Sequence, residues 1–274
     1  MKTNRVIHGD ALTELQKLPA GVVQAIIADP PYFNVLEDEA WDTQWKTAAD
    51  YLAWCDGWVA ESMRVLRDDG LAFIFGQLGK REHTFLHLMS RLSQQHQFHD
   101  LIIWDRAVGY DERRDSFTPQ YEMVLVLRKG DSVKFNKDTV RIPYDATTIE
   151  AYMKDNRYKD KEARRKHLEK GKYATNILRV PSLKGISKEK CGHPSQKPLA
   201  LIEKLIACST DAGDLVLDPF LGSGTTAAAA KKLKRKWLGI EKDSSYIKIA
   251  RKRLLSITAP SSKSSIKNRK SSIP

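Results

Sequence analysis

The residues at positions 29–32 combine one carboxylate, two prolines and one aromatic ring, directly after an apolar run. That run, Val22–Ala28, is rich in Val and Ile and too short for a helix, which predicts a buried strand. The prolines end the strand because neither can donate to a sheet ladder. Asp29 and Tyr32 are therefore expected at the carboxyl end of a strand, where open α/β sheets bind ligands. They could hold a flat ring that bears an amine, although a simple polar turn explains these four residues equally well.

A second segment, Leu215–Ala227, has the composition of a short strand, a glycine turn and the start of a helix. Gly222, Gly224 and Ala227 match the G-x-G-x-x-G/A spacing, which lets backbone approach a ligand at a helix N-terminus. The next predicted strand ends in Glu241, roughly 20 positions after the glycines, where an acidic residue usually binds ribose hydroxyls. This half of the chain is therefore expected to bind a nucleoside-like cofactor.

Three motifs resemble those of the bacterial DNA amino-methyltransferases. Asp29–Tyr32 resembles the catalytic motif, Asp218–Thr225 resembles the S-adenosylmethionine motif, and His193–Pro198 resembles the block that precedes the glycine turn. The catalytic motif comes first and the cofactor motif last, as in the permuted β class. The resemblance covers about residues 5–255. It implies a site-specific DNA methyltransferase, either solitary or part of a restriction-modification system, with S-adenosylmethionine as its cofactor.

The resemblance also implies roles for individual residues. The catalytic residues would be Asp29, Pro30, Pro31 and Tyr32. The residues near the cofactor would be Asp10, Asp29, His193, Ser195, Lys197, Asp218, Phe220, Gly222, Gly224, Thr225 and Glu241. Lys197 is expected beside the methionine carboxylate and Asp10 near the adenine ring of the cofactor. A helix N-cap for Asp10 and an ordinary loop histidine at position 193 are the alternatives.

The target implied by the resemblance is an exocyclic amine of a DNA base. Such an amine is a poor nucleophile, and hydrogen bonds to the Asp29 carboxylate and the Pro30 carbonyl would favour a pyramidal nitrogen. Tyr32 would stack on the base, which must be flipped out of the duplex to reach the site. In this family an Asp at the first motif position favours adenine N6, whereas a Ser is typical of cytosine-N4 enzymes. We therefore predict adenine, with cytosine N4 as the alternative.

Other classes of protein fit the sequence less well. Methylation at C5 of cytosine needs a cysteine that follows proline in that enzyme family, and no cysteine here does. RNA and protein-glutamine methyltransferases with a related catalytic turn mostly carry the glycine motif first. A DNA-binding partner subunit without activity predicts erosion of the motifs, and the motifs are intact.

Basic charge is concentrated in one part of the chain. The whole chain has a net charge of +12, and residues 128–190 hold 18 basic and 9 acidic residues. Four tyrosines lie among them: Tyr144, Tyr152, Tyr158 and Tyr173. Such a segment is typical of a phosphate-backbone contact, although residues 159–166 could equally form a solvated helical face. Together with the loops at 33–45 and 104–120, this segment is expected to contact double-stranded DNA.

Alternating apolar and helical patterns predict an α/β fold with a doubly wound, mostly parallel, seven-stranded sheet. The strands are expected near 5–8, 22–28, 71–76, 101–105, 121–127, 215–217 and 237–240, with an antiparallel hairpin at 121–127. The expected regions are a catalytic half at 1–130, a target-recognition insertion at 131–190, a cofactor half at 191–255 and a disordered basic tail at 256–274.

The apolar runs, cysteines and histidines indicate the cellular location and whether a metal site is expected. No apolar run approaches the ~20 residues of a membrane span, and no signal peptide is expected. Three widely spaced cysteines indicate a reducing cytoplasm without disulfides. His83 and His87 lack a third partner at metal-ligand spacing, so no metal site is expected. A homodimer is an expectation from the family alone.

Overall fold

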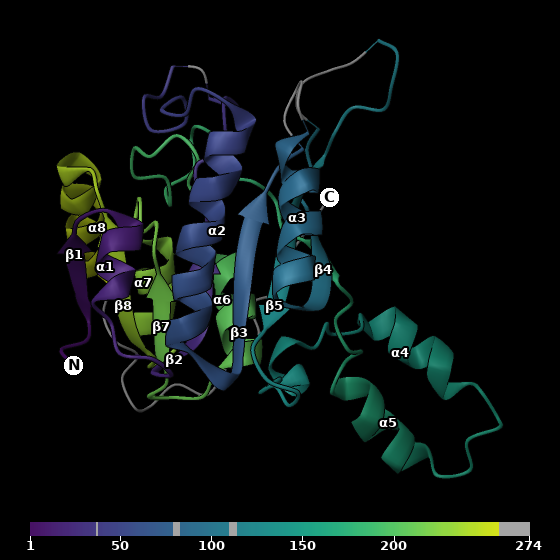
Figure 1. Cartoon of the computed structure of the whole chain (residues 1–274). Coiled ribbons are helices and arrows are strands. Elements are labelled where there is room, and N and C mark those ends of the chain that lie inside the picture. The colour runs from purple at the N-terminus through teal and green to yellow at the C-terminus, as the bar shows by residue number, and fades with distance from the viewer. Residues whose placement is uncertain (37, 79–82, 110–113, 258–274) are drawn as a thin grey trace.

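The computed structural model describes residues 1–36, 38–78, 83–109 and 114–257, which form one sheet with helices on both faces (Figure 1). The strands are β1 (Arg5–His8), β2 (Val23–Ala28), β3 (Leu66–Gly76), β4 (Gln97–Asp105), β5 (Tyr121–Arg128), β6 (Ile177–Arg179), β7 (Leu215–Asp218) and β8 (Lys236–Glu241). The helices are α1 (Ala11–Gln16), α2 (Ala48–Val65), α3 (Thr84–Gln95), α4 (Ala146–Met153), α5 (Lys161–Glu169), α6 (Leu199–Ser209), α7 (Thr225–Lys232) and α8 (Ser244–Ser256), with a 3-10 turn at Lys137–Val140.

The strand order confirms the predicted fold class. The described strands lie in the order β1-β8-β7-β2-β3-β5-β4-β6. All neighbours are parallel except the two pairs that β5 makes with β3 and β4. The antiparallel strand predicted at residues 121–127 is therefore confirmed.

The predicted number of seven strands is wrong, because the described residues form eight. The additional strand, β6, has three residues and pairs with the edge strand β4. Ile177 is 58% exposed, so no buried apolar run marks this strand in the sequence. Backbone pairing creates it instead, beginning with the Ile103 N–H that donates to the Asn176 carbonyl at 2.8 Å.

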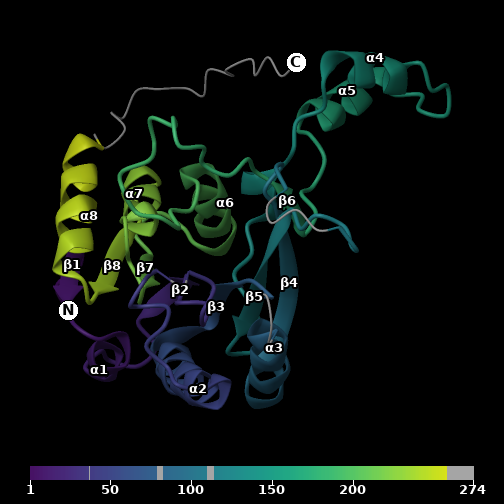
Figure 2. The ribbon, with the colours of Figure 1, turned by 90° about the horizontal axis from the view of Figure 1, so that it is seen from above.

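The core has two layers because both faces of the sheet are covered. Helices α1, α2 and α3 pack on one face and α6, α7 and α8 on the other, as the view in Figure 2 shows. Ile26 of β2 belongs to the first layer and its neighbour Ile27 to the second. A central strand that is buried on both faces reads as a continuous apolar run, which explains the sequence before the catalytic motif.

Helices α4 and α5 stand away from the body as a pair, beside the β4–β6 edge (Figures 1 and 2). The chain segments that enter and leave this pair are joined by two backbone hydrogen bonds between Ile142 and Lys172, at 2.8 and 2.9 Å. Gly171 beside this bridge has a φ of +81°, a left-handed conformation that favours glycine. The pair lies within the predicted insertion at 131–190.

Over the described ranges, no helix combines the length and apolar character that a membrane span requires. The same residues contain no cluster of three or more His, Cys, Asp or Glu arranged for a metal ion. The tail predicted at 256–274 lies outside the described residues beyond Ile257, as do residues 110–113 of the loop at 104–120.

Candidate active site

The two motif halves meet at one edge of the sheet. Asp29 follows β2 and Asp218 ends β7, and these strands are parallel neighbours with Ile26 opposite Leu217. The carboxyl ends of such strands lie together, so both carboxylates line one cavity of about 1310 Å³. The strands that carry the two motifs are therefore direct neighbours in the sheet.

The predicted site residues line this cavity, with one exception. Those at its wall are Asp10, Asp29, Pro30, Pro31, Tyr32, His193, Ser195, Lys197, Asp218, Phe220, Gly222, Thr225 and Glu241. Gly224 lies behind the wall as the N-cap of α7, with a φ of +78°. A Cβ at Gly224 would come within 3.0 Å of the Ala250 Cβ, so this glycine allows α7 to approach α8 closely.

Two donors hold the Asp29 carboxylate. The Tyr32 hydroxyl donates to Oδ1 at 2.5 Å, and Lys197 Nζ lies 2.8 Å from both carboxylate oxygens. The Tyr32 hydroxyl also lies 3.3 Å from Oε2 of Glu122. Burial, followed by the charges of Asp29 and Glu122, raises the pKa of Tyr32 well above its usual value. The phenol therefore stays protonated and acts as a donor.

Lys197 contacts partners other than the one expected from the sequence. Its Nζ lies 2.8 Å from Asp29 and 3.3 Å from Glu122, and its side chain is 7% exposed. Burial lowers the pKa of Lys197, but the two carboxylates outweigh burial and raise it. The ammonium is therefore charged and ties Asp29 to Glu122. Its role at the methionine carboxylate stays a prediction.

Asp42 organises the loop that follows the catalytic turn. Its carboxylate accepts the backbone N–H groups of Tyr32, Val35 and Leu36 at 2.5, 2.7 and 2.8 Å. Asp42 is 1% exposed. Phe33 and Asn34 adopt left-handed φ values of +61° and +57°, and this conformation is costly for Phe, whereas Asn tolerates it. The Asp42 carboxylate offsets this cost by satisfying three backbone donors.

Another part of the cavity wall is built around the glycine turn. Glu241, at the end of β8, accepts the Gly222 N–H at 2.7 Å. Gly222 has a φ of +48°, and a Cβ there would come within 3.0 Å of His193 Nε2. The His193 ring lies between Trp41 and Tyr246, at centroid distances of 6.2 and 4.3 Å. Burial lowers the pKa of His193 to about 4, so the ring is neutral at pH 7.

Two further predicted residues lie in the cavity wall. Asp10 is the N-cap of α1 and accepts the Thr13 N–H at 3.1 Å, while its side chain also belongs to the cavity wall. The N-cap alternative is therefore correct, and it does not remove Asp10 from the site. Phe220 packs edge-on against Trp58 at 5.0 Å and at a tilt against Trp54 at 5.6 Å, which gives the cavity an apolar wall.

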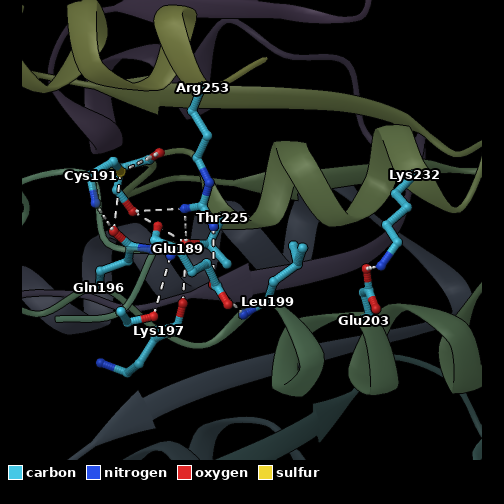
Figure 3. Close-up of polar contacts among 11 residues, drawn as sticks. Glu189, Cys191, Gln196, Lys197, Leu199, Glu203, Thr225, Lys232 and Arg253 are labelled. Atoms are coloured by element: carbon cyan, nitrogen blue, oxygen red, sulfur yellow. Dashed lines mark hydrogen bonds and ion pairs between the residues drawn. The ribbon is translucent and has the colours of Figure 1, made fainter. Parts of the chain in front are cut away.

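A polar network ties the segment that carries Lys197 to the start of α7 (Figure 3). Arg253 reaches from α8 to Thr225 Oγ1 at 2.7 Å and to Glu189 at 3.2 Å. Glu189 accepts the Leu199 N–H at 2.7 Å, and the Thr225 hydroxyl donates to the Lys197 carbonyl at 3.3 Å. These bonds fix the backbone from which Lys197 extends into the cavity.

Glu122 and Arg253 were not predicted as site residues, and Asp42 was predicted only as part of the loop at 33–45. Glu122, Asp42 and Arg253 are all nearly buried, and each holds a predicted site residue or the backbone beside it. Glu122 has a weak signal, since it is a charged residue at the start of an apolar strand. Asp42 belongs to a Trp-Asp pair in the loop after the motif, and Arg253 has no distinguishing signal among its basic neighbours.

The fold and the site together define a class of protein. An open α/β sheet carries a glycine turn, the acidic ends of two strands and an aromatic wall around one cavity. These residues fit S-adenosylmethionine, because Gly222 has no Cβ at the turn and Glu241 offers a carboxylate at the second strand tip. The Asp29 carboxylate lies in the same cavity. The class is that of the methyltransferases.

The comparison with protein families places the chain within this class. A family model described as DNA methylase, of the N6 and N4 type, matches residues 23–252. The DNA adenine methyltransferase YhdJ of Escherichia coli is 33% identical over 91% of this chain and 82% of its own length. The type II methyltransferase M.HpaI of Haemophilus parainfluenzae is 29% identical over 91% of this chain and 74% of its own length.

This protein belongs to the N6/N4 DNA methylase family. Among solved structures, the M1.HpyAVI complex with S-adenosylmethionine is similar, with a TM-score of 0.60, 26% identity and coverage of 91% of this chain and 98% of that one. The cytosine-N4-specific PvuII methyltransferase has a TM-score of 0.68 at 18% identity, with 94% and 89% covered, which shows a common fold. Family membership confirms the predicted enzyme class and S-adenosylmethionine as the cofactor.

Proposed function

We propose that this protein transfers the methyl group of S-adenosylmethionine to N6 of a flipped-out adenine at a specific site in duplex DNA. The observation that carries the proposal is the position of Asp29, which lies in the same cavity as the Gly222 turn at the junction of β2 and β7. The similarity to a relative named as a DNA adenine methyltransferase supports adenine over cytosine.

The chain supplies binding and orientation. The Gly222 turn and Glu241 would hold the nucleoside part of S-adenosylmethionine, which supplies an activated methyl group when bound. The Asp29 carboxylate and the Pro30 carbonyl would accept the two N–H groups of the target amine. The Tyr32 ring would stack on the base. The base can enter the cavity only after it has left the duplex, and this unpairing and unstacking costs about a few kcal/mol.

The reaction needs no covalent intermediate with the protein. The target amine would be the nucleophile, and bound S-adenosylmethionine would supply the methyl group and keep the electron pair of its C–S bond on sulfur. The nitrogen then carries a positive charge until it releases one proton to solvent. Asp29 acts as an oriented acceptor during the attack, and its negative charge stabilises the charge that develops on the nitrogen.

Nucleoside mass spectrometry of duplex DNA treated with the protein and S-adenosylmethionine tests the proposal. N6-methyladenine is the expected product, and N4-methylcytosine without N6-methyladenine would refute the choice of base. Asp29→Ala should abolish methylation while calorimetry still detects cofactor binding. Equal turnover on single-stranded RNA of the same sequence would instead favour an RNA methyltransferase.

The remaining expectations follow from the proposed function. The segment at 131–190, which contains α4 and α5, would contact DNA, with 1–130 as the catalytic half and 191–255 as the cofactor half. Bacterial relatives support a cytoplasmic location. A homodimer is checked by light scattering of the purified protein at several concentrations. Long-read sequencing of DNA from a host that expresses the chain would give the recognised site.

A further inference from the structure

Glu122 is a buried carboxylate in the cavity wall without an assigned role. It is the second residue of β5 and is 4% exposed. Its Oε2 lies 3.3 Å from Lys197 Nζ and 3.3 Å from the Tyr32 hydroxyl. Its Oε1 lies 3.3 Å from Arg106 Nη1. One oxygen of Glu122 therefore faces two donors at once.

The Tyr32 hydroxyl and the Lys197 ammonium also donate to Asp29, the carboxylate that is proposed to accept the target amine. Asp29 Oδ1 accepts from Tyr32 and from Lys197, and Oδ2 also accepts from Lys197. A carboxylate has about four acceptor sites, so three of them are already taken. One acceptor site of Asp29 remains for the amine N–H, and loosening the contacts to Tyr32 and Lys197 makes the others available. Both donors already lie close to Glu122, so a small movement transfers them to it.

We propose that Glu122 is a positioning residue for methyl transfer, which takes over the Tyr32 hydroxyl and the Lys197 ammonium when the target amine binds to Asp29. This inference rests on the function proposed above. The movement leaves the Asp29 carboxylate free for the amine. It also lets the Tyr32 ring turn toward the base while its hydroxyl keeps an acceptor.

Charge gives a second reason for a carboxylate at this position. Asp29 and Lys197 alone form a neutral pair, whereas Asp29, Lys197 and Glu122 together carry one negative charge. That charge faces an amine nitrogen that becomes positive as it attacks. Arg106 pairs with the other oxygen of Glu122, but its side chain is 22% exposed, so solvent screens it more than it screens Lys197 at 7%.

The first test is Glu122→Gln in the full chain. Gln keeps the size and one acceptor oxygen but removes the charge. We expect the single-turnover rate of methyl transfer to fall about 10- to 100-fold, the range for a lost hydrogen bond to a charged group. Calorimetric affinity for S-adenosylmethionine and for duplex DNA should change less than about threefold. Glu61→Gln, at a half-buried ion pair of α2 with Arg64 outside the cavity wall, is the matched control and should keep the wild-type rate.

A double-mutant cycle separates positioning from a structural role. Tyr32→Phe removes the hydroxyl that Glu122 is proposed to receive. The fold-decrease in single-turnover rate caused by E122Q should therefore be at least about threefold smaller in Y32F than in the wild type. Additive losses would overturn the proposal, as would a wild-type rate in E122Q. E122D, which retains the charge, should recover part of the rate, and no recovery would also overturn it. If E122Q does not fold, the same cycle is measured with E122D in place of E122Q, and additive losses of rate in E122D and Y32F would overturn the proposal.

The two proposals fail in different ways. A wild-type protein that makes no N6-methyladenine would refute the proposed function. A wild-type protein that methylates adenine, next to an E122Q variant that is equally fast, would refute the role of Glu122 alone. An E122Q variant that loses cofactor affinity as strongly as rate would show that Glu122 supports the fold of the cavity rather than the position of its donors.

Discussion

Asp42 is the residue on which the loop after the catalytic turn depends. Its buried carboxylate accepts three backbone N–H groups, one of them from Tyr32. Asp42→Asn replaces one acceptor oxygen by an N–H₂ group, which faces backbone donors and cannot accept from them. We expect a loss of about 1–3 kcal/mol in stability and a methylation rate at least about 10-fold lower.

Thermal unfolding and single-turnover methylation check this prediction. For a chain of this size the melting temperature should fall by about 2–4 °C for each kcal/mol lost. Asp56→Asn, at the surface ion pair between α2 and Arg91 of α3, is the control and should change neither quantity. Wild-type stability and rate in D42N would show that the loop does not need this carboxylate.

Asp218 gives a pH dependence of stability. Burial is the largest cause that raises its pKa, from 3.8 to about 7. The folded state therefore binds a proton that the unfolded state has released between pH 4 and 7, so this group's contribution to stability falls as pH rises through that window. Asp218→Asn removes the titration. Denaturant unfolding of both proteins should show D218N gaining stability relative to the wild type from pH 4 to 7, by on the order of a few kcal/mol, and no further change above pH 7. A constant difference across pH 4–7 would contradict the raised pKa.

The sequence predicted the residues that motifs mark, and it missed those that act through them. Asp29, Gly222 and Glu241 stand at strand ends, where chain direction alone places them at one edge of the sheet. Glu122 could not be recognised, because its importance depends on Lys197, which lies 75 positions away and meets it only in the folded chain. Contacts between distant segments leave no local pattern in one sequence.

At the scale of elements, prediction succeeded where burial is continuous. β2 and β7 are buried along their whole length, and apolar runs mark them clearly. α4 buries no residue and α5 buries only Leu168, so neither has a strong apolar stripe. The segment 159–166 could be interpreted either as helix or as a DNA contact, and α5 begins at Lys161 within it. The start of each of these helices is fixed by an N-cap, Asp145 for α4 and Asp160 for α5. In the sequence these two residues resemble ordinary loop residues.

The α4–α5 pair should be removable without loss of the body. Ile142 and Lys172 are hydrogen-bonded to each other, so their backbones lie close enough for a short linker to replace 144–170. The shortened protein should keep its melting temperature within a few degrees and bind S-adenosylmethionine, because the cavity lies elsewhere. Its affinity for duplex DNA should fall at least about 10-fold, because cationic contacts to phosphates are lost.

Calorimetry and a filter-binding assay at one fixed salt concentration measure the two affinities of the shortened protein. A charge-matched control replaces Lys159 and Lys166 by Gln, which removes the same net charge of +2 as the deletion of 144–170, and leaves the helices in place. Comparable losses of DNA affinity in both variants would assign the effect to charge. Unchanged DNA affinity in the shortened protein would exclude the pair from the DNA interface.

At the scale of the molecule, we expect the same fold to form when the order of the motifs along the chain is changed. β8 and β1 are parallel neighbours, and α8 returns from the end of β8 and contacts β1. Figure 2 shows the start of α8 beside β1 and the N-terminus, and the end of α8 at the far end of the helix. A flexible linker that spans the length of α8 can therefore join the two ends without crossing the sheet.

A circular permutant tests this reasoning. Ile257 is joined to Thr3 by a flexible linker, and new ends are opened between α4 and α5, at residues 155–156. The cofactor motif then precedes the catalytic motif, yet every strand keeps its neighbours, so the permutant should bind S-adenosylmethionine within about threefold of the wild type and methylate the same site. As a control, opening the chain between Gly222 and Gly224 breaks the turn that faces the cavity and should abolish cofactor binding. Loss of binding in the first permutant as well would show that the connection through α4 and α5 is required for the two halves to meet.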